Sequence, residues 1–111
     1  MYQIIIIGAG PAGLSAGLRA KELNLNFLIL EKGKIAQTFL SAYTNGKEVT
    51  DFPKTLEKKG NFWFEKCRVE ELITRWKKIA KSLNIKENQE ILKIQKEKGK
   101  FLIQTQKEKY E

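Results

Sequence analysis

Histidine is absent from the 111 residues, and cysteine occurs once, as Cys67. Without histidine the chain cannot form a Ser-His-Asp triad, use an imidazole general base or bind a metal through imidazole. A single cysteine excludes an internal disulfide framework and a Cys-x-x-Cys redox pair, and it fits a reducing cytoplasm. We therefore expect no catalytic residue and no metal site, and we interpret Cys67 as structural because no neighbouring group predicts an activated thiolate.

Long apolar stretches are also missing from the sequence. None approaches the roughly 20 apolar residues that a membrane-spanning helix needs. The apolar run near the N-terminus is short, has no basic flank and leads straight into a glycine turn, so it does not resemble a signal peptide. These features predict a cytoplasmic protein without a membrane partner.

The charge is strongly basic but dispersed. The formal net charge is +8, from 21 lysines and arginines against 13 acidic residues. Most basic residues alternate with Glu, Gln or Asn, as in residues 95–100, which is typical of a solvated face. A nucleic-acid surface would gather basic residues on one element with aromatic residues beside them. We therefore expect no nucleic-acid partner.

The first 31 residues carry the most specific pattern in the chain. They predict a strand at 2–7, a glycine turn at 8–13, an amphipathic helix at 12–23 and a second strand at 26–30, followed by Glu31. Isolated glycines would indicate only a tight turn, whereas here strands, glycines, helix and acid agree. The pattern is the Gly-x-Gly-x-x-Gly fingerprint in its required context, and it predicts dinucleotide binding by a Rossmann-like βαβ unit.

The residues of the glycine turn have separate tasks. Gly8 lets the chain turn sharply, Gly10 allows a pyrophosphate to approach the backbone, and Gly13 lets the helix lie close to the strand. Pro11 suits the first helical turn, where its missing N–H is not needed. The helix N-terminus then directs N–H groups and a partial positive charge at the phosphates. The isoleucines at 4–7 predict a parallel strand that is buried on both faces.

Glu31 lies 18 residues after Gly13, at the end of the second predicted strand. There its carboxylate can accept hydrogen bonds from both ribose hydroxyls of an adenosine. It would repel a 2′-phosphate, so the site favours FAD or NAD over NADP. The acid alone does not separate FAD from NAD.

Residues 32–67 form a long connection with several turn-forming residues. Asn45–Gly46 is compatible with a small hairpin and equally with an ordered loop. The aromatic cluster at 62–64 is expected to anchor the following helix in the core, and covering a flavin or adenine edge is the alternative.

Residues 68–84 carry apolar side chains at three- and four-residue steps, which predicts an amphipathic helix with Trp76 in the core. Residues 85–111 predict a β-meander in which Ile85 starts a short strand. Its main part is a hairpin at 90–96 and 100–106 with one buried face, and the chain stops before another strand. A doubly wound sheet needs about five or six parallel strands, so the α/β domain is expected to be incomplete.

The order of these parts resembles a known family. The chain resembles the FAD-dependent pyridine nucleotide–disulfide oxidoreductases in four features. It has a GxGPAG turn in a strand–helix–strand unit that ends in Glu-Lys-Gly at 31–33, a Phe-Pro at 52–53, a helix beginning Glu-Glu-Leu at 70–72 and a β-meander. The thioredoxin-reductase-like branch, including bacillithiol disulfide reductase-like proteins, is the most similar. The resemblance spans the whole chain and is specific over residues 2–33.

The resemblance implies a set of FAD contacts. The glycine turn would line the pyrophosphate, Glu31 would hold the adenosine ribose, and Lys32 would lie near the adenine end. Gln37 and Thr38 fall where relatives often carry a glycine pair followed by Gln, Thr or an aromatic residue, although Ala36 and Gln37 replace the glycines here. The expected cofactor-binding residues are Gly8, Ala9, Gly10, Pro11, Ala12, Gly13, Glu31, Lys32, Gln37 and Thr38.

The resemblance also implies a function. The chain would be the FAD-binding segment of a flavin-dependent NAD(P)H oxidoreductase that passes electrons from a nicotinamide through FAD to a disulfide or other acceptor. The family's NAD(P)H domain and redox Cys-x-x-Cys are absent from the 111 residues, so the segment alone is expected to be inactive. A homodimer of the complete parent is compatible with the resemblance. A segment of an NAD-dependent dehydrogenase or flavin monooxygenase, and a non-catalytic nucleotide-binding fragment, stay open.

Overall fold

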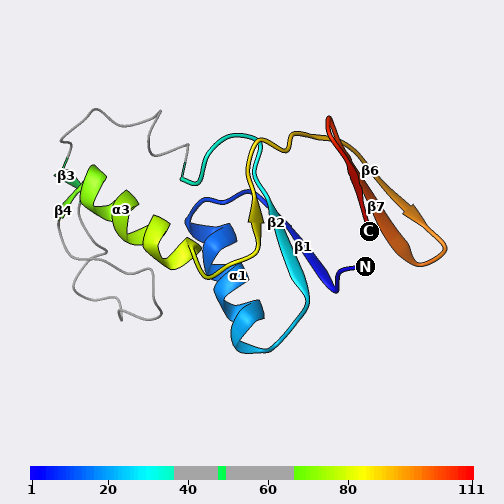
Figure 1. Cartoon of the computed structure of the whole chain (residues 1–111), viewed down its shortest axis with the longest axis horizontal. Coiled ribbons are helices and arrows are strands. Elements are labelled where there is room, and N and C mark those ends of the chain that lie inside the picture. Colours follow the sequence, from blue (N-terminus) through cyan, green and yellow to red (C-terminus); the bar gives the residue numbers. More distant parts are fainter. Residues whose placement is uncertain (37–47, 50–66) are drawn as a thin grey trace.

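The computed structural model describes residues 1–36, 48–49 and 67–111, which form two helices and three small sheets (Figure 1). A parallel sheet has the strand order β1-β2-β5, an antiparallel pair joins β3 and β4, and β6-β7-β8 form an antiparallel sheet. The elements are β1 (Ile4–Ile7), α1 (Pro11–Glu22), β2 (Phe27–Leu30), β3 (Glu48–Val49), β4 (Cys67–Arg68), α3 (Val69–Ala80), β5 (Ile85–Lys86), β6 (Ile91–Glu97), β7 (Lys100–Thr105) and β8 (Lys109–Tyr110).

The parallel sheet is organised around β2, whose four residues are all buried. Phe27 and Ile29 face a core shared with the two helices, whereas Leu28 and Leu30 pack in a second core with Ile103 and other residues of the β6-β7-β8 sheet. Alternate side chains of a strand point to opposite faces. The helices and the meander therefore cover opposite faces of β2.

The expectation that β1 is buried on both faces was wrong. Ile4 is 38% exposed and Ile7 is 53% exposed, although Ile5 and Ile6 pack against the two cores. Within the described residues β1 pairs only with β2, in the register Ile4↔Phe27 to Ile7↔Leu30. An apolar strand needs neighbours on both sides to be buried throughout, and the described residues supply a neighbouring strand on one side of β1 only.

Close packing brings α1 onto the sheet, as the glycines predict. A Cβ built at Gly13 would overlap the carbonyl oxygen of Gly8, and one built at Gly17 would lie 2.6 Å from Ile29 Cδ1. Each glycine therefore lets the helix axis lie nearer to the strands than a larger residue would. After the helix, Asn24 takes a left-handed conformation with φ 56°, as expected for its place after the last turn.

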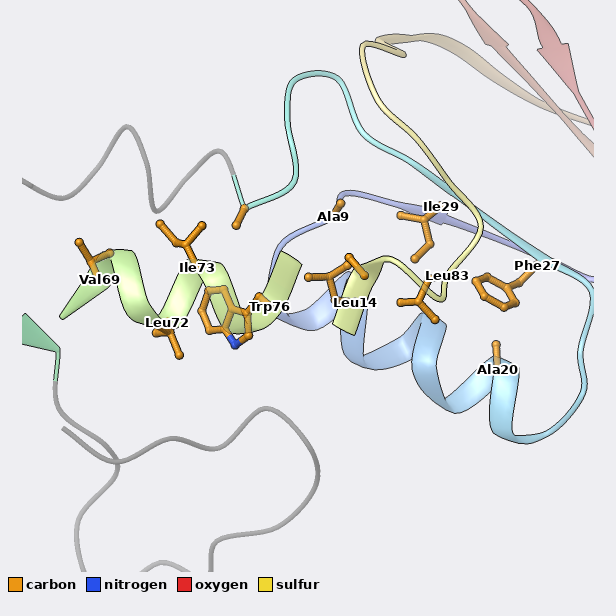
Figure 2. Packing of buried hydrophobic residues seen from close by; sticks show 12 residues of the cluster. Ala9, Leu14, Ala20, Phe27, Ile29, Val69, Leu72, Ile73, Trp76 and Leu83 are labelled. Carbon is orange, nitrogen blue, oxygen red and sulfur yellow. The ribbon is translucent and has the colours of Figure 1, made fainter. Parts of the chain in front are cut away.

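Helix α3 confirms the predicted amphipathic pattern, with Trp76 only 3% exposed. It begins one residue later and ends four residues earlier than the predicted 68–84, because Arg68 pairs in β4 and the chain turns after Ala80. Figure 2 shows Leu14 of α1 between Trp76 and Leu83 in the core that joins the two helices.

The segment after α3 differs from the expected meander in two ways. Residues 85–86 pair in parallel with β2 instead of joining the antiparallel strands, and β8 adds a third strand that pairs with β7. The expected buried face is narrow, since Ile103 is buried whereas Ile94 and Phe101 are 51% and 57% exposed. The reason is that Ile91, Ile103 and Tyr110 pack with Leu28 and Leu30 of β2, whereas β6 is exposed after Ile91.

A buried polar cluster ties the meander to the end of β5. Thr105 Oγ1 donates to Gln89 Oε1 at 2.9 Å, and the Tyr110 hydroxyl donates to the same oxygen at 3.3 Å. All three side chains are buried. Buried polar groups of this kind are costly unless they are hydrogen-bonded, so the cluster fixes how β7 and β8 sit on the parallel sheet.

After residue 36, the structure describes the long connection only at the two short strands β3 and β4. Glu48–Val49 pairs antiparallel with Cys67–Arg68, so the region predicted as a connection at 32–67 contains a strand pair formed across it. The Asn45–Gly46 turn, the aromatic cluster at 62–64 and the side chain of Cys67 lie outside the described part. Within the described ranges, no helix has the length and apolar character needed to cross a membrane.

Candidate functional site

The glycine turn connects the C-terminal end of β1 to the N-terminus of α1. Gly8 has φ 103°, a conformation that favours glycine, and its N–H donates to the Leu30 carbonyl at 2.8 Å. Gly10 is the N-cap residue of α1 and Pro11 follows as the first helical residue. The Leu14 N–H closes the first turn on the Gly10 carbonyl at 2.9 Å. The turn therefore has the conformation that the fingerprint predicts.

The N-terminus of α1 is suited to an anion from outside the helix. No side chain caps it and its first turn holds no acidic residue. The first N–H groups of any α-helix have no intrahelical partner, and they carry the positive end of the helix dipole. A Cβ built at Gly10 would meet no atom within 4 Å, so the space above this backbone is open. A pyrophosphate fits the residues present here.

Glu31 lies directly beside this turn. Its Oε1 accepts the Ala9 N–H at 2.9 Å and its Oε2 accepts the Gly33 N–H at 2.7 Å. Each carboxylate oxygen can accept a second hydrogen bond. The carboxylate can therefore hold the turn and still accept a hydrogen bond from a ribose hydroxyl.

A second segment closes over the turn from the other side. The Ala36 N–H donates to the Ala9 carbonyl at 3.0 Å, and Ala36 is only 1% exposed. Its φ is 60°, in the left-handed region that glycine prefers, although the residue here is an alanine. The backbone path that the sequence left open here is thus the left-handed one.

The structure brings most of the predicted site residues together. The residues of the glycine turn and Glu31 converge at the C-terminal ends of β1 and β2, where ligands of parallel sheets bind. Lys32 follows directly on Glu31 and is exposed. Gln37 and Thr38 lie outside the described residues, so their contacts stay predictions.

Two residues near the site were missed by sequence reasoning. Glu87 Oε2 accepts the Ile35 N–H at 2.9 Å, and Gln89 donates its N–H to the Glu31 carbonyl at 2.8 Å. Both follow β5, more than 50 positions after the segment that they contact. No local motif marks them, because the contact depends on β5 lying beside β2.

Lys86, at the end of β5, interacts with the meander. Its Nζ lies 4.9 Å from the centroid of the Tyr110 ring and 4.0 Å from Glu108 Oε1. Desolvation lowers the pKa of Lys86, but attraction to Tyr110 and Glu108 outweighs it, so the pKa is raised above 10.5. Burial is the main cause that raises the pKa of Tyr110 above 10.0, and Lys86 opposes it. This pair links β5 to β8 and does not contact the glycine turn.

An apolar cavity of about 370 Å³ lies on the opposite side of β1 from this site's helix. Its walls come from β1, the N-terminal residues and the β6-β7 hairpin, and include Ile5, Ile7, Ile94 and Phe101. None of the fingerprint glycines lines it. Because Glu31 does not line it either, we distinguish this cavity from the dinucleotide site.

The chain belongs to the pyridine nucleotide-disulphide oxidoreductase family, which matches residues 5–111. The family resemblance and the predicted fold class, a Rossmann-like βαβ unit with a helix and an antiparallel sheet, are therefore confirmed. The members of this family are oxidoreductases.

Individual relatives agree with this assignment. The solved bacillithiol disulfide reductase from Staphylococcus aureus is 29% identical and superposes with a TM-score of 0.82 over 98% of this chain and 35% of that protein. The thioredoxin reductase of Ureaplasma parvum is 55% identical over 42 residues, which are 34% of this chain and 14% of that enzyme. The structure of T. acidophilum thioredoxin reductase shares the fold, with a TM-score of 0.76 at 24% identity over 98% of this chain and 32% of that one. The chain thus spans about a third of the length of these solved relatives.

Proposed function

We propose that residues 1–111 are the FAD-binding segment of a flavin-dependent NAD(P)H oxidoreductase that passes electrons from a nicotinamide through FAD to a disulfide or other acceptor. The observation that carries the proposal is the juxtaposition of an uncapped α1 N-terminus with the Glu31 carboxylate. The first suits a pyrophosphate, and the second suits the ribose of an adenosine. Family membership favours FAD over the NAD of a simple dehydrogenase.

The residues of the segment have binding roles in this proposal. The backbone at Gly10 and the first turn of α1 hold the pyrophosphate, Glu31 accepts from the ribose hydroxyls, and Lys32 lies near the adenine end. Gln37 and Thr38 extend the contacts toward the flavin. The isoalloxazine of bound FAD supplies the redox chemistry. The chain's own residues therefore bind and orient, and none is assigned to proton transfer.

The complete enzyme needs parts that these residues do not provide. The nicotinamide would bind through a further domain, and the complete parent would form a homodimer in a reducing cytoplasm. The single cysteine supports the reducing location. The relatives' names point to a disulfide as the class of acceptor, because they are a bacillithiol disulfide reductase and a thioredoxin reductase.

The test is a calorimetric titration of the purified chain with FAD, NADH, NADPH and AMP. We expect FAD to bind, and we expect Gly10→Val and Glu31→Ala each to weaken that binding by about tenfold or more. The valine side chain would fill the open space above the Gly10 backbone, and Glu31→Ala would remove the carboxylate that accepts from the ribose hydroxyls. Glu97→Ala is the matched control because it deletes the same charge from an exposed site in β6. Binding of NADH without FAD would refute the flavoprotein assignment, and loss of FAD binding in Glu97→Ala would show that charge alone explains the effect.

A further inference from the structure

Glu87 connects the end of the parallel sheet to the segment that closes the glycine turn. It follows β5 directly and its side chain is half-buried. Its Oε2 accepts the Ile35 N–H at 2.9 Å, across 52 positions of sequence. A carboxylate acceptor makes a stronger hydrogen bond than a neutral one. The Ile35 N–H would otherwise lack this partner, and an unpaired backbone donor that is partly buried is costly.

The two residues after Glu87 hold the same segment. Asn88 donates its N–H to the Gly33 carbonyl at 3.1 Å, and Gln89 donates to the Glu31 carbonyl at 2.8 Å. Residues 87–89 therefore contact the 31–35 segment at three places. Of these three contacts, only the one with Glu87 is made by a side chain. A substitution at Glu87 can therefore remove that hydrogen bond without changing the other two.

The constraint passes from this segment to the glycine turn. Ala36 follows Ile35, is buried, and donates its N–H to the Ala9 carbonyl at 3.0 Å. Ala9 is itself fully buried and donates its own N–H to Glu31. A shift of Ile35 would thus move the backbone that precedes Gly10. Glu87 reaches the turn through Ile35 and Ala36.

We propose that Glu87 is a positioning residue of the dinucleotide site, which holds the 33–36 segment against the glycine turn through the Ile35 N–H. This inference rests on the proposed function, because it assigns Glu87 a part in the affinity of that site. It differs from the role of Glu31, whose carboxylate faces both the turn and the proposed ribose. In this proposal Glu87 acts through the Ile35 backbone and not through a contact with the ligand.

The test separates the reach of the side chain from its charge. Glu87→Asp keeps the carboxylate but is one methylene too short to reach the Ile35 N–H. Glu87→Gln loses the charge but keeps an amide oxygen at the same length. We expect Glu87→Asp to raise the Kd for FAD about fivefold, because it loses one hydrogen bond. We expect Glu87→Gln to leave the Kd within about twofold of wild type, because its amide oxygen still accepts from the Ile35 N–H. Glu97→Asp and Glu97→Gln are the matched controls on β6.

Amide hydrogen exchange of the ligand-free variants provides the second readout. We expect exchange at Ile35 and Ala36 to become about tenfold faster in Glu87→Asp, which loses the hydrogen bond. We expect a much smaller increase in Glu87→Gln, which keeps a weaker, neutral acceptor. Equal FAD affinity and equal exchange in Glu87→Asp and wild type would overturn the proposal, as would a loss in Glu87→Gln as large as in Glu87→Asp. If wild type does not bind FAD, the proposed function fails, and the exchange comparison still decides whether Glu87 holds the segment.

Discussion

Gly13→Ala is expected to destabilise the fold, whereas Gly10→Ala is expected to preserve the fold and weaken dinucleotide binding. A Cβ at Gly13 would overlap the Gly8 carbonyl oxygen and lie 2.9 Å from its carbonyl carbon. Both are backbone atoms of a turn that is tied to Leu30 by a hydrogen bond of 2.8 Å. Neither atom can rotate away, so the overlap is relieved only if α1 moves off the sheet.

The cost of that movement can be bounded. Overpacking a well-packed site costs about 1 to 3 kcal/mol, and a clash with backbone belongs at the upper end. Moving α1 also loosens the contacts of Leu14 and Ala20, which are both buried in the core with α3. We therefore expect a loss of about 3 kcal/mol in the free energy of unfolding. For a domain of this size that corresponds to a fall of about 15 °C in Tm.

Gly10 presents the opposite case. A Cβ there meets no atom within 4 Å. The residue has φ −87° and ψ −170°, which alanine adopts without strain. Stability should change by less than about 0.5 kcal/mol. The methyl group instead occupies the open space in which we place the pyrophosphate. It holds the phosphate away from the backbone N–H groups, and the weakened charged hydrogen bond lowers FAD affinity by about tenfold or more.

Thermal unfolding followed by circular dichroism, together with calorimetric FAD titration, tests both variants. Gly17→Ala is the intermediate control, because its Cβ would lie 2.6 Å from Ile29 Cδ1, the end of a flexible side chain. We expect the Tm values to fall in the order wild type, Gly17→Ala, Gly13→Ala, with Gly10→Ala close to wild type. A Gly13→Ala protein that melts with wild type, or a Gly10→Ala protein that melts with Gly13→Ala, would refute this reasoning.

Three further outcomes follow from the described contacts. Ala36→Gly should raise the free energy of unfolding by up to about 1 kcal/mol in urea, because relief of the left-handed φ of 60° exceeds the loss of one buried methyl; a clear decrease would contradict this. Gln89→Leu should lower it by about 1 to 3 kcal/mol, since Thr105 and Tyr110 lose their shared acceptor, whereas the exposed Gln104→Leu should not. The pKa of Tyr110 is raised by burial, so its neutral form stabilises the fold below about pH 10, and that contribution is lost as pH rises through the raised value. The stability difference between wild type and Tyr110→Phe should therefore shrink in alkaline urea titrations, and a constant difference would contradict the shift.

The βαβ unit was predictable because its determinants are close together in sequence. The turn at Gly8, the close approach at Gly13 and the left-handed Asn24 each follow from one or two residues and their immediate neighbours. The same holds for α3, whose apolar spacing defines one buried face whatever it packs against. Only the ends of these elements shifted by a few residues, where pairing with β4 or a turn interrupted the pattern.

The burial of β1, the pairing of β5 and the strand β8 could not be predicted in the same way. An isoleucine run indicates a strand, but the exposure of Ile4 and Ile7 depends on which strands lie beside it. The sequence allowed Ile85 to join either sheet. Its pairing with Ile29 depends on where the packing of α3 places the residues that follow the helix. A two-residue strand such as β8 carries too few residues to show a period of two.

The sequence by itself determined that the ligand is a dinucleotide, and it located the glycine turn and Glu31. The turn and the strand that ends before Glu31 depend on backbone conformations that local residues impose. Only the tertiary structure decided how that turn is supported. Glu87 and Gln89 reach it because β5 lies parallel to β2, and the buried cluster of Gln89 with Thr105 and Tyr110 holds the meander on the other face. Contacts between segments more than 50 positions apart arise from packing, and no periodicity along the chain records them.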